Sequence, residues 1–283
     1  MPDADPMYLR KRLSAQLQAA RKKAGYSQPE VAEEMVWSLS KVMRLESGRT
    51  KISITDLRAL IVFYGVPEQA AAELLTAAHE ARRHPWWHEY SHLLSEGFKS
   101  YLGYEAAASV VRNFEVLFIP GLLQTEEYAR AILARSVVPE KEELLELRMR
   151  RQERLLQAST GTELRFLIDE AALRRVVGGP AVMRAQLDHL REVSELSHVR
   201  VGVVPFESGL YPLLRSPYVI FEFPNAGQDM VVYLENPDGS VIVRDKATVG
   251  VQRSVEDYLE AFWEVENAHA KPVNELQVSH DPT

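Results

Sequence analysis

The sequence predicts a multidomain α+β protein, with an N-terminal bundle of five helices and a C-terminal domain built on a mixed α/β sheet. Apolar residues recur at helical spacing through residues 9–83, whereas strand-like and helical runs alternate from about residue 105 onward. The chain has 283 residues, of which 46% are hydrophobic and 26% charged. This length and composition are typical of a globular protein with more than one domain.

Five helices are expected in residues 9–83, because capping residues separate the apolar stripes. The first covers 9–24 and is followed by Gly25. Ser27 caps the second, and Glu30 three positions later completes a capping box. The last three helices begin at Ser38, Ser53 and Pro67, and the inward positions include Val31, Ala32, Met35, Leu57, Leu60, Ile61, Leu74 and Leu75.

Val36 and Trp37 form the turn between the second and third helices. In the third helix Val42 and Leu45 face inward, which leaves an outward face of Leu39, Ser40, Lys41, Met43 and Arg44. Small polar and basic side chains can reach base edges and phosphates from a helix in the major groove. The pattern therefore predicts a helix-turn-helix that binds double-stranded DNA.

Residues 9–83 resemble the lambda-repressor-like helix-turn-helix domains of the xenobiotic-response-element family. The resemblance rests on Ser27-Gln28, Val31-Ala32, Ser38, Val42, Arg44-Leu45-Glu46 and Gly48. It implies base contacts by Leu39, Ser40 and Arg44, a phosphate contact by Gln28, and a partly buried ion pair between Arg21 and Glu46. Lys41 and Arg49 are further candidates for phosphate contact.

Val36 departs from the family pattern, in which this turn position is usually glycine. A valine there requires a different turn geometry or a strained backbone.

The alternative interpretation of the first domain is a solvated bundle, in which Leu39 packs and Met43 is plain surface. The ordered combination of cap, turn length, apolar stripe and Glu-x-Gly end favours DNA binding. Residues 1–85 carry a net charge of +3 and the remainder −10. An acidic body suppresses non-specific phosphate binding while one basic face engages DNA, although the same counts fit a body that is acidic only for solubility.

Residues 84–104 are expected to be an aromatic connector, because Trp86, Trp87, Tyr90 and Phe98 follow the break at Pro85. Its tryptophans would dock the first domain on the second. His84, His88 and His92 recur every four residues, a spacing that would place three imidazoles on one helix face and suit a metal. Without accompanying carboxylate or cysteine ligands, histidines that are exposed or packed on aromatic rings are favoured, and we expect neither a metal nor a cofactor.

Residues 105–270 are expected to form the α+β regulatory and dimerisation domain, followed by a tail over 271–283. Strands are predicted at 110–119, 163–169, 199–206, 217–223 and 230–235. Helices are predicted at 122–134, 139–158, 170–177, 181–196 and 247–270. The strand runs are hydrophobic enough to require helices on at least one face of the sheet.

Residues 95–270 resemble the uncharacterised C-terminal domain that follows such helix-turn-helix modules in actinomycete regulators. The residues that carry the resemblance include the runs 120–126 and 170–174, Gly178-Gly179, Gln186-Leu187, His189-Leu190 and Val203-Val204-Pro205-Phe206. The resemblance implies a transcriptional regulator, often paired with a small companion protein encoded beside it in an antitoxin-like arrangement.

Catalytic chemistry is not expected. The chain has no cysteine, which excludes thiolate sites and disulfides. Asp169 and Glu170 would serve as an acid and base only if they converged, and a carboxylate after a strand is also an ordinary helix cap. Gly178-Gly179-Pro180 lacks the spacing of a nucleotide loop and is interpreted as a turn. Aromatic residues around Tyr211, Phe114 and Phe118 are the candidate lining of a binding pocket.

The expected function is a transcriptional regulator that binds an operator as a homodimer, under control of its C-terminal domain by a partner protein or ligand. The alternative is an antitoxin-like protein that chiefly binds a small companion and represses its own genes. An enzyme fused to a DNA-binding domain would need a catalytic constellation that the sequence does not display. No signal peptide or apolar run of membrane-spanning length is present, so we expect a cytoplasmic, nucleoid-associated protein with no membrane partner.

Overall fold

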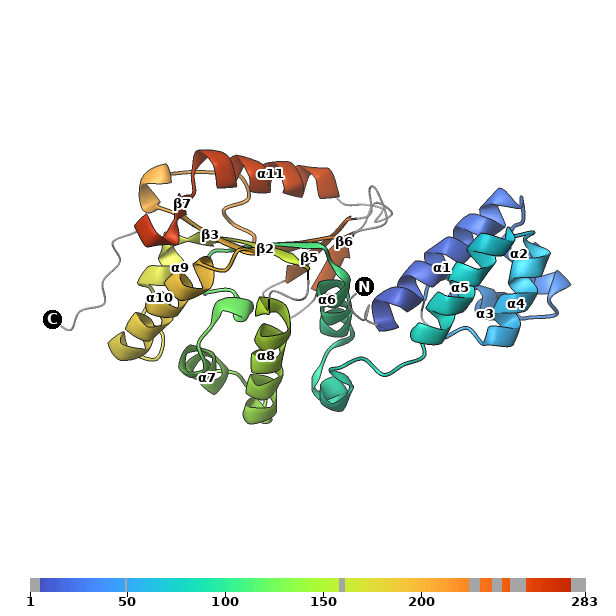
Figure 1. Ribbon diagram of the computed structural model, residues 1–283, viewed down its shortest axis with the longest axis horizontal. Coiled ribbons are helices and arrows are strands. Elements are labelled where there is room, and N and C mark those ends of the chain that lie inside the picture. The colour runs from blue at the N-terminus through green and yellow to red at the C-terminus, as the bar shows by residue number, and fades with distance from the viewer. Residues whose placement is uncertain are drawn as a thin grey trace. The chain divides into compact units, whose positions relative to one another are not determined.

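A computed structural model describes residues 6–48, 50–157, 161–223, 230–235, 241–244 and 253–275. The chain divides into two compact units. One comprises Asp3–His88 with Leu102–Ala107, and the other Glu89–Tyr101 with Ala108–Thr283. The predicted α+β class is confirmed, since a helical bundle precedes a domain with a mixed sheet (Figure 1).

The N-terminal bundle contains the five predicted helices, α1 (Pro6–Lys23), α2 (Gln28–Glu34), α3 (Leu39–Glu46), α4 (Ile54–Phe63) and α5 (Glu68–Glu80). Ser27, Ser38 and Ser53 each accept a hydrogen bond from the backbone N–H three residues later, and Ser27 forms a complete capping box with Glu30. The helices enclose one apolar core around Leu57, which is completely buried, with Leu13, Leu17, Val31, Val42, Leu45, Leu60 and Leu74. Local capping and apolar spacing therefore explain this bundle.

The connector contains more structure than the sequence predicted. A 3₁₀ helix, η1 (His88–Leu93), is followed by α6 (Glu96–Ala107), which the prediction left as irregular chain. His84 precedes η1, so the three histidines do not share one helix, because Pro85 separates His84 from the turn that follows. Among the described residues no cluster of three or more histidine, aspartate or glutamate side chains is arranged to hold a metal.

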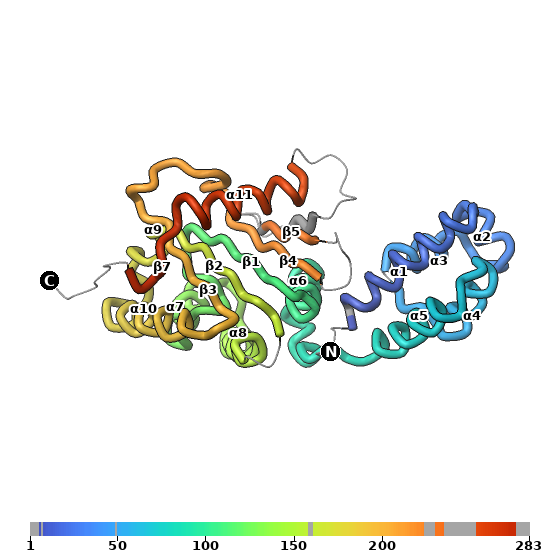
Figure 2. The backbone as a smooth tube through the Cα atoms, turned by 45° about the horizontal axis from the view of Figure 1, so that its top comes forward, coloured from blue at the N-terminus to red at the C-terminus, as the bar shows by residue number. Residues whose placement is uncertain are grey.

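The C-terminal domain is built on a sheet of seven described strands in the order β6-β5-β4-β1-β2-β3-β7. Figure 2 shows β4, β1, β2 and β3 side by side in the middle of this sheet. The central strands β1 (Val110–Glu115), β2 (Glu163–Asp169) and β3 (Val199–Val204) are parallel. The flanking strands β4 (Tyr218–Glu222), β5 (Met230–Glu235), β6 (Val241–Arg244) and β7 (Lys271–Pro272) pair antiparallel with their neighbours.

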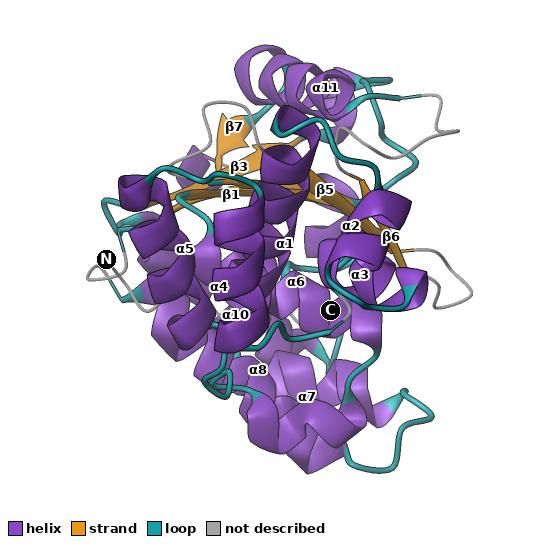
Figure 3. Cartoon of the chain, turned by 90° about the vertical axis from the view of Figure 1, so that its right-hand side faces the viewer, coloured by secondary structure: helices purple, strands orange, loops and turns teal. Residues whose placement is uncertain are grey.

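Helices cover both faces of this sheet (Figures 1 and 3). Helix α11 (Val255–Ala268) lies on one face, and α7 (Glu126–Ala134), α8 (Lys141–Leu156) and α10 (Pro180–Ser194) lie on the other. Between α11 and the sheet lies a buried core, to which α11 contributes Tyr258 and Phe262 and the strands contribute Phe114, Ile220 and Val232. The short helix α9 (Glu170–Arg174) follows β2 directly. Two-sided coverage explains why most residues of β1 and β2 are buried.

The structure departs from the predicted boundaries at several points. β1 ends at Glu115, four residues before the predicted end of the strand, ahead of the turn into η2 (Gly121–Leu123). Residues 271–275 form β7 and η5 (Val273–Glu275), where the sequence predicted a tail. The prediction missed β7 because a two-residue strand that contains proline has no detectable periodicity. β6 was not predicted. The predicted start of the last helix at 247–252 lies outside the described residues.

Candidate nucleic-acid interface

The turn between α2 and α3 is a helix C-terminal motif with valine in the position that favours glycine. Val36 has a φ of 54°, and its side chain is 91% exposed. The Val36 N–H donates to the Glu33 carbonyl at 3.1 Å, and the Trp37 N–H donates to the Ala32 carbonyl at 2.8 Å. The glycine-type geometry is therefore retained, and the β-branched residue bears left-handed backbone strain.

Helix α3 presents one face to the core and one to solvent. Val42 and Leu45 are buried. The side chains of the predicted base-contact residues Leu39, Ser40 and Arg44 are all exposed, as is Met43 between them. Their positions along α3 place them on one side of the helix. The side chain of Arg44 forms no hydrogen bond or ion pair with any described residue, so its guanidinium is free to bind a partner.

Glu46, at the end of α3, is the centre of a buried polar network. Its carboxylate accepts hydrogen bonds from Arg21 Nε at 2.6 Å, Arg21 Nη2 at 3.0 Å and Gln28 Nε2 at 2.8 Å. Arg21 Nη1 donates to the Tyr26 carbonyl at 2.6 Å. The hydrogen bond and charge of Glu46 raise the pKa of Arg21, and burial raises the pKa of the adjacent Tyr64 to about 12. The network ties α1, α2 and α3 together and fixes the angle at which α3 is presented.

Gln28 has a role in the structure that the sequence did not indicate. Its side-chain nitrogen is directed to Glu46, whereas the resemblance assigned the side chain to a phosphate. An amide nitrogen carries two N–H donors, so one remains for an external acceptor. Gln28 is therefore first a part of the network that positions α3.

Lys41 is also held within the protein. Its Nζ lies 3.1 Å from Asp56 Oδ2, at the start of α4, and 3.7 Å from the centroid of the Trp37 ring. About a third of its side chain is exposed. Lys41 is thus separated from the row formed by Leu39, Ser40 and Arg44, and a phosphate would have to compete with Asp56 for it. Arg49, the other predicted phosphate contact, lies outside the described residues.

Asp169 and Glu170, for which the sequence left a helix cap and an acid–base pair as alternatives and favoured the cap, both have structural partners. Asp169 caps α9 by accepting from the Ala171 N–H at 2.8 Å, and its other oxygen accepts from the Tyr211 hydroxyl. Glu170 accepts from Arg174 Nε at 2.6 Å and from the Phe206 N–H at 2.8 Å. Both carboxylates are buried and diverge to separate partners, which matches the helix-cap alternative. Burial and the bond to Asp169 raise the pKa of Tyr211.

The aromatic residues expected to line a pocket differ in their surroundings. The rings of Phe114 and Tyr211 are buried against each other with centroids 5.9 Å apart, whereas Phe118 is 44% exposed. Two cavities of this domain, of about 490 and 280 Å³, have other linings, so an aromatic pocket around these residues stays a prediction.

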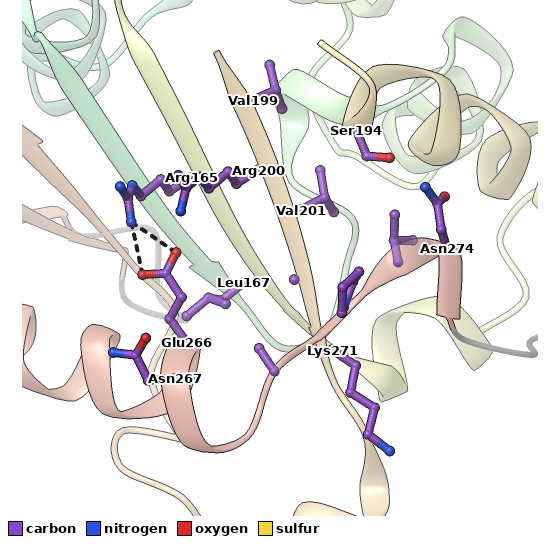
Figure 4. A pocket seen from close by; sticks show the side chains of 14 residues that line it. Arg165, Leu167, Ser194, Val199, Arg200, Val201, Glu266, Asn267, Lys271 and Asn274 are labelled. Carbon is purple, nitrogen blue, oxygen red and sulfur yellow. Dashed lines mark hydrogen bonds and ion pairs between the residues drawn. The ribbon is translucent and has the colours of Figure 1, made fainter. Parts of the chain in front are cut away.

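An open pocket of about 490 Å³ lies at the β3 side of the sheet, near the ends of α10 and α11 (Figure 4). Arg165 forms its polar wall, where it pairs with Glu163 at 2.7 Å and with Glu266 at 3.1 Å. Arg200 is the register neighbour of Arg165 on β3 and is exposed. The charge of Arg165 is therefore satisfied within the protein, and that of Arg200 is solvated.

The family comparisons divide the chain in the same way as its structure. A model described as a helix-turn-helix domain matches residues 12–74. A model described as a domain of unknown function (DUF5753) matches residues 98–264, more than half of the chain. None of the curated proteins compared with this chain matches it. Within the described part of the chain, no helix combines the length and apolar character needed to cross a membrane.

Proposed function

We propose that this chain, which belongs to the DUF5753 family and has an N-terminal helix-turn-helix domain, is a sequence-specific DNA-binding regulator. In this proposal α3 lies in the major groove and the C-terminal domain controls binding. The observation that carries the proposal is the exposed row of Leu39, Ser40 and Arg44, supported from behind by the Arg21–Glu46–Gln28 network. A rigid helix with unpartnered outward side chains is preorganised for base contact.

Each member of the exposed row suits a different feature of the groove. The guanidinium of Arg44 can donate two parallel hydrogen bonds to O6 and N7 of a guanine. Ser40 can donate to or accept from a base edge, and Leu39 offers an apolar surface for a thymine methyl group. We propose these three residues as the base-reading set.

Phosphate contacts would fix the register of this helix on the duplex. We propose Gln28, through its second amide N–H, together with Lys41 and Arg49. Lys41 would exchange Asp56 for a phosphate, so part of its contribution to DNA binding is offset by the ion pair that it gives up.

We further propose that the protein binds its operator as a homodimer. One helix-turn-helix makes few base contacts, whereas two symmetric copies read an inverted repeat whose half-sites lie about 34 Å apart or a multiple of this. We assign residues 9–83 to DNA binding, 84–104 to the connector and 105–270 to dimerisation and regulation.

The proposal is tested by selecting binding sites from a pool of random DNA duplexes with the purified full-length protein. We expect enrichment of a symmetric sequence, and a footprint on any copy of it that lies upstream of the protein's own gene. Measured mass in solution should show a dimer on one duplex. Retention of DNA without enrichment of any sequence would contradict sequence-specific binding, and one protomer per duplex would contradict the dimer.

The acidic C-terminal part of the chain favours a second function, that of an antitoxin-like protein. Residues 86–283 carry a net charge of −10, which suits a small basic companion protein. Co-purification from cells of a stoichiometric small protein that changes DNA affinity would support this alternative. A protein that purifies alone and represses fully without a companion would exclude it.

A further inference from the structure

A second cavity in the C-terminal domain, of about 280 Å³, has apolar walls and an arginine at its edge. Its walls come from the connector, α7, α8 and β5, and include Leu94, Phe98, Leu133, Leu147 and Tyr233. Arg148 and Arg151 on α8 complete the lining. The volume lies just below the range of about 300–1,000 Å³ usual for sites that bind small molecules.

Arg148 differs from Arg112 and Arg165, two other arginines of this domain, because no carboxylate of a described residue pairs with it. The single side-chain hydrogen bond of Arg148 within the described chain is to the side-chain oxygen of Gln124, a neutral amide. By contrast, Arg112 donates to Glu222 at 2.6 Å and Arg165 is paired with Glu266. Burial and the nearby Arg151 lower the pKa of Arg148 to about 10, so it is still protonated at neutral pH.

Arg151 contributes a second guanidinium to the same wall. It is 7% exposed and lies over the rings of Phe98 and Tyr101, 5.4 and 5.1 Å from their centroids. These aromatic faces stabilise the Arg151 side chain. The cavity therefore combines a leucine-rich surface with the largely buried guanidinium of Arg148, which has no carboxylate partner among the described residues.

We propose that this cavity binds a small monocarboxylic acid whose apolar body fills the leucine and aromatic walls and whose carboxylate pairs with Arg148. One anionic group balances the guanidinium of Arg148, and the planar fork of arginine matches a carboxylate with two parallel hydrogen bonds. An uncharged apolar molecule would leave the buried charge uncompensated.

The location gives such a ligand a connection to regulation. Leu94 and Phe98 belong to the connector, the segment of chain between the DNA-binding helices and β1. A bound acid would contact this segment directly and stabilise its packing on α8. In terms of the proposed function, the cavity is the effector site of the regulator, although acid binding itself does not depend on DNA.

The test is isothermal titration calorimetry of the full-length protein, without DNA, using hexanoate, octanoate and phenylacetate as probes. The primary amide of each acid serves as its neutral analogue. We expect one of the acids to bind with one molecule per protomer, and its amide to bind at least about tenfold more weakly. Arg148→Met should weaken acid binding by at least about tenfold, while Arg148→Lys, which keeps the charge, should retain an intermediate affinity.

Arg191→Met is the matched control, because Arg191 pairs with Asp188 on the surface of α10, away from the cavity lining. It should bind the acids as the wild-type protein does, and near-ultraviolet circular dichroism should show that all variants are folded. The proposal is overturned if none of the three acids binds at millimolar concentrations, if the amide of the acid that binds has the same affinity as the acid, or if Arg148→Met leaves acid affinity unchanged. Because no DNA is present, these outcomes are independent of whether the operator proposal holds.

Discussion

Two largely buried arginines, one in each domain, differ in whether a carboxylate of the protein balances their charge. Arg21 in the N-terminal bundle has two hydrogen bonds to Glu46 and one to the Tyr26 carbonyl, so its charge is balanced. Arg148 in the C-terminal domain has a neutral amide as its partner and lines a cavity. The complete hydrogen-bond network around Arg21 holds α3 in place, whereas the charge of Arg148 beside a cavity can be balanced by a ligand. Four changes test this account of the two domains, from the largest expected effect on stability to the smallest.

Glu46→Ala should have the largest effect, because it leaves the guanidinium of Arg21 buried without a counter-ion and removes the acceptor of Gln28. We expect the free energy of unfolding of the N-terminal domain to fall by about 3–5 kcal/mol. Urea denaturation followed by circular dichroism measures this loss. Glu33→Ala, at an exposed position on α2, is the control and should change stability little. A loss below about 1 kcal/mol for Glu46→Ala would show that the network is not a major support.

Val36→Gly should raise stability, because glycine adopts the left-handed conformation of the turn without the strain that valine bears there. The strain of about 1–2 kcal/mol is partly offset by the greater freedom of glycine in the unfolded chain, which leaves a gain of about 1 kcal/mol. The same urea titration measures it. Val36→Ala keeps a Cβ atom and should gain less. If glycine gives no gain, the backbone at this turn is not strained in solution.

Arg148→Met should change the free energy of unfolding by less than about 1 kcal/mol in the absence of ligand. Removal of an unbalanced buried charge favours the folded state, and loss of the hydrogen bond to Gln124 opposes it by a similar amount. Arg112→Met is the comparison, since it leaves Glu222 without its partner and should be clearly destabilising. Equal losses in the two variants would place Arg148 among the structural arginines.

Asp56→Asn should have the smallest effect on stability, because the Lys41–Asp56 pair is partly exposed and such pairs contribute about 0.2–1 kcal/mol. Its effect on DNA binding should be easier to detect. Lys41 is released for phosphate, so affinity for random DNA should rise and the slope of log affinity against log salt should steepen by about one. An unchanged slope would show that Lys41 does not reach the backbone.

The helical bundle was predictable because its signals are local. Ser27, Ser38 and Ser53 lie at the starts of helices in the sequence and accept the expected backbone N–H groups in the structure. The identity of residue 36 likewise indicated strain, since a glycine-type turn without glycine has few alternatives.

Contacts between distant residues were not predictable in the same way. Gln28 and Glu46 are 18 positions apart, and the choice of Gln28 between Glu46 and an external phosphate depends on its rotamer. The cavity beside Arg148 draws on the connector, α7, α8 and β5, so no single stretch of sequence contains it. Short strands such as β7 are also not detectable from the spacing of apolar residues, because two residues do not define a pattern.

The most direct test of the central claim, that α3 reads bases, is the ratio of specific to random DNA affinity for Arg44→Ala. Arg82→Ala is the matched control, since Arg82 is an exposed arginine that follows α5. With the selected site in hand, titrations of both variants against that site and against a scrambled duplex give the ratio. We expect Arg44→Ala to lose about 1–3 kcal/mol on the selected site and little on the scrambled one, with Arg82→Ala close to wild type on both. Equal losses of Arg44→Ala on the two duplexes would remove Arg44 from base reading and contradict the account.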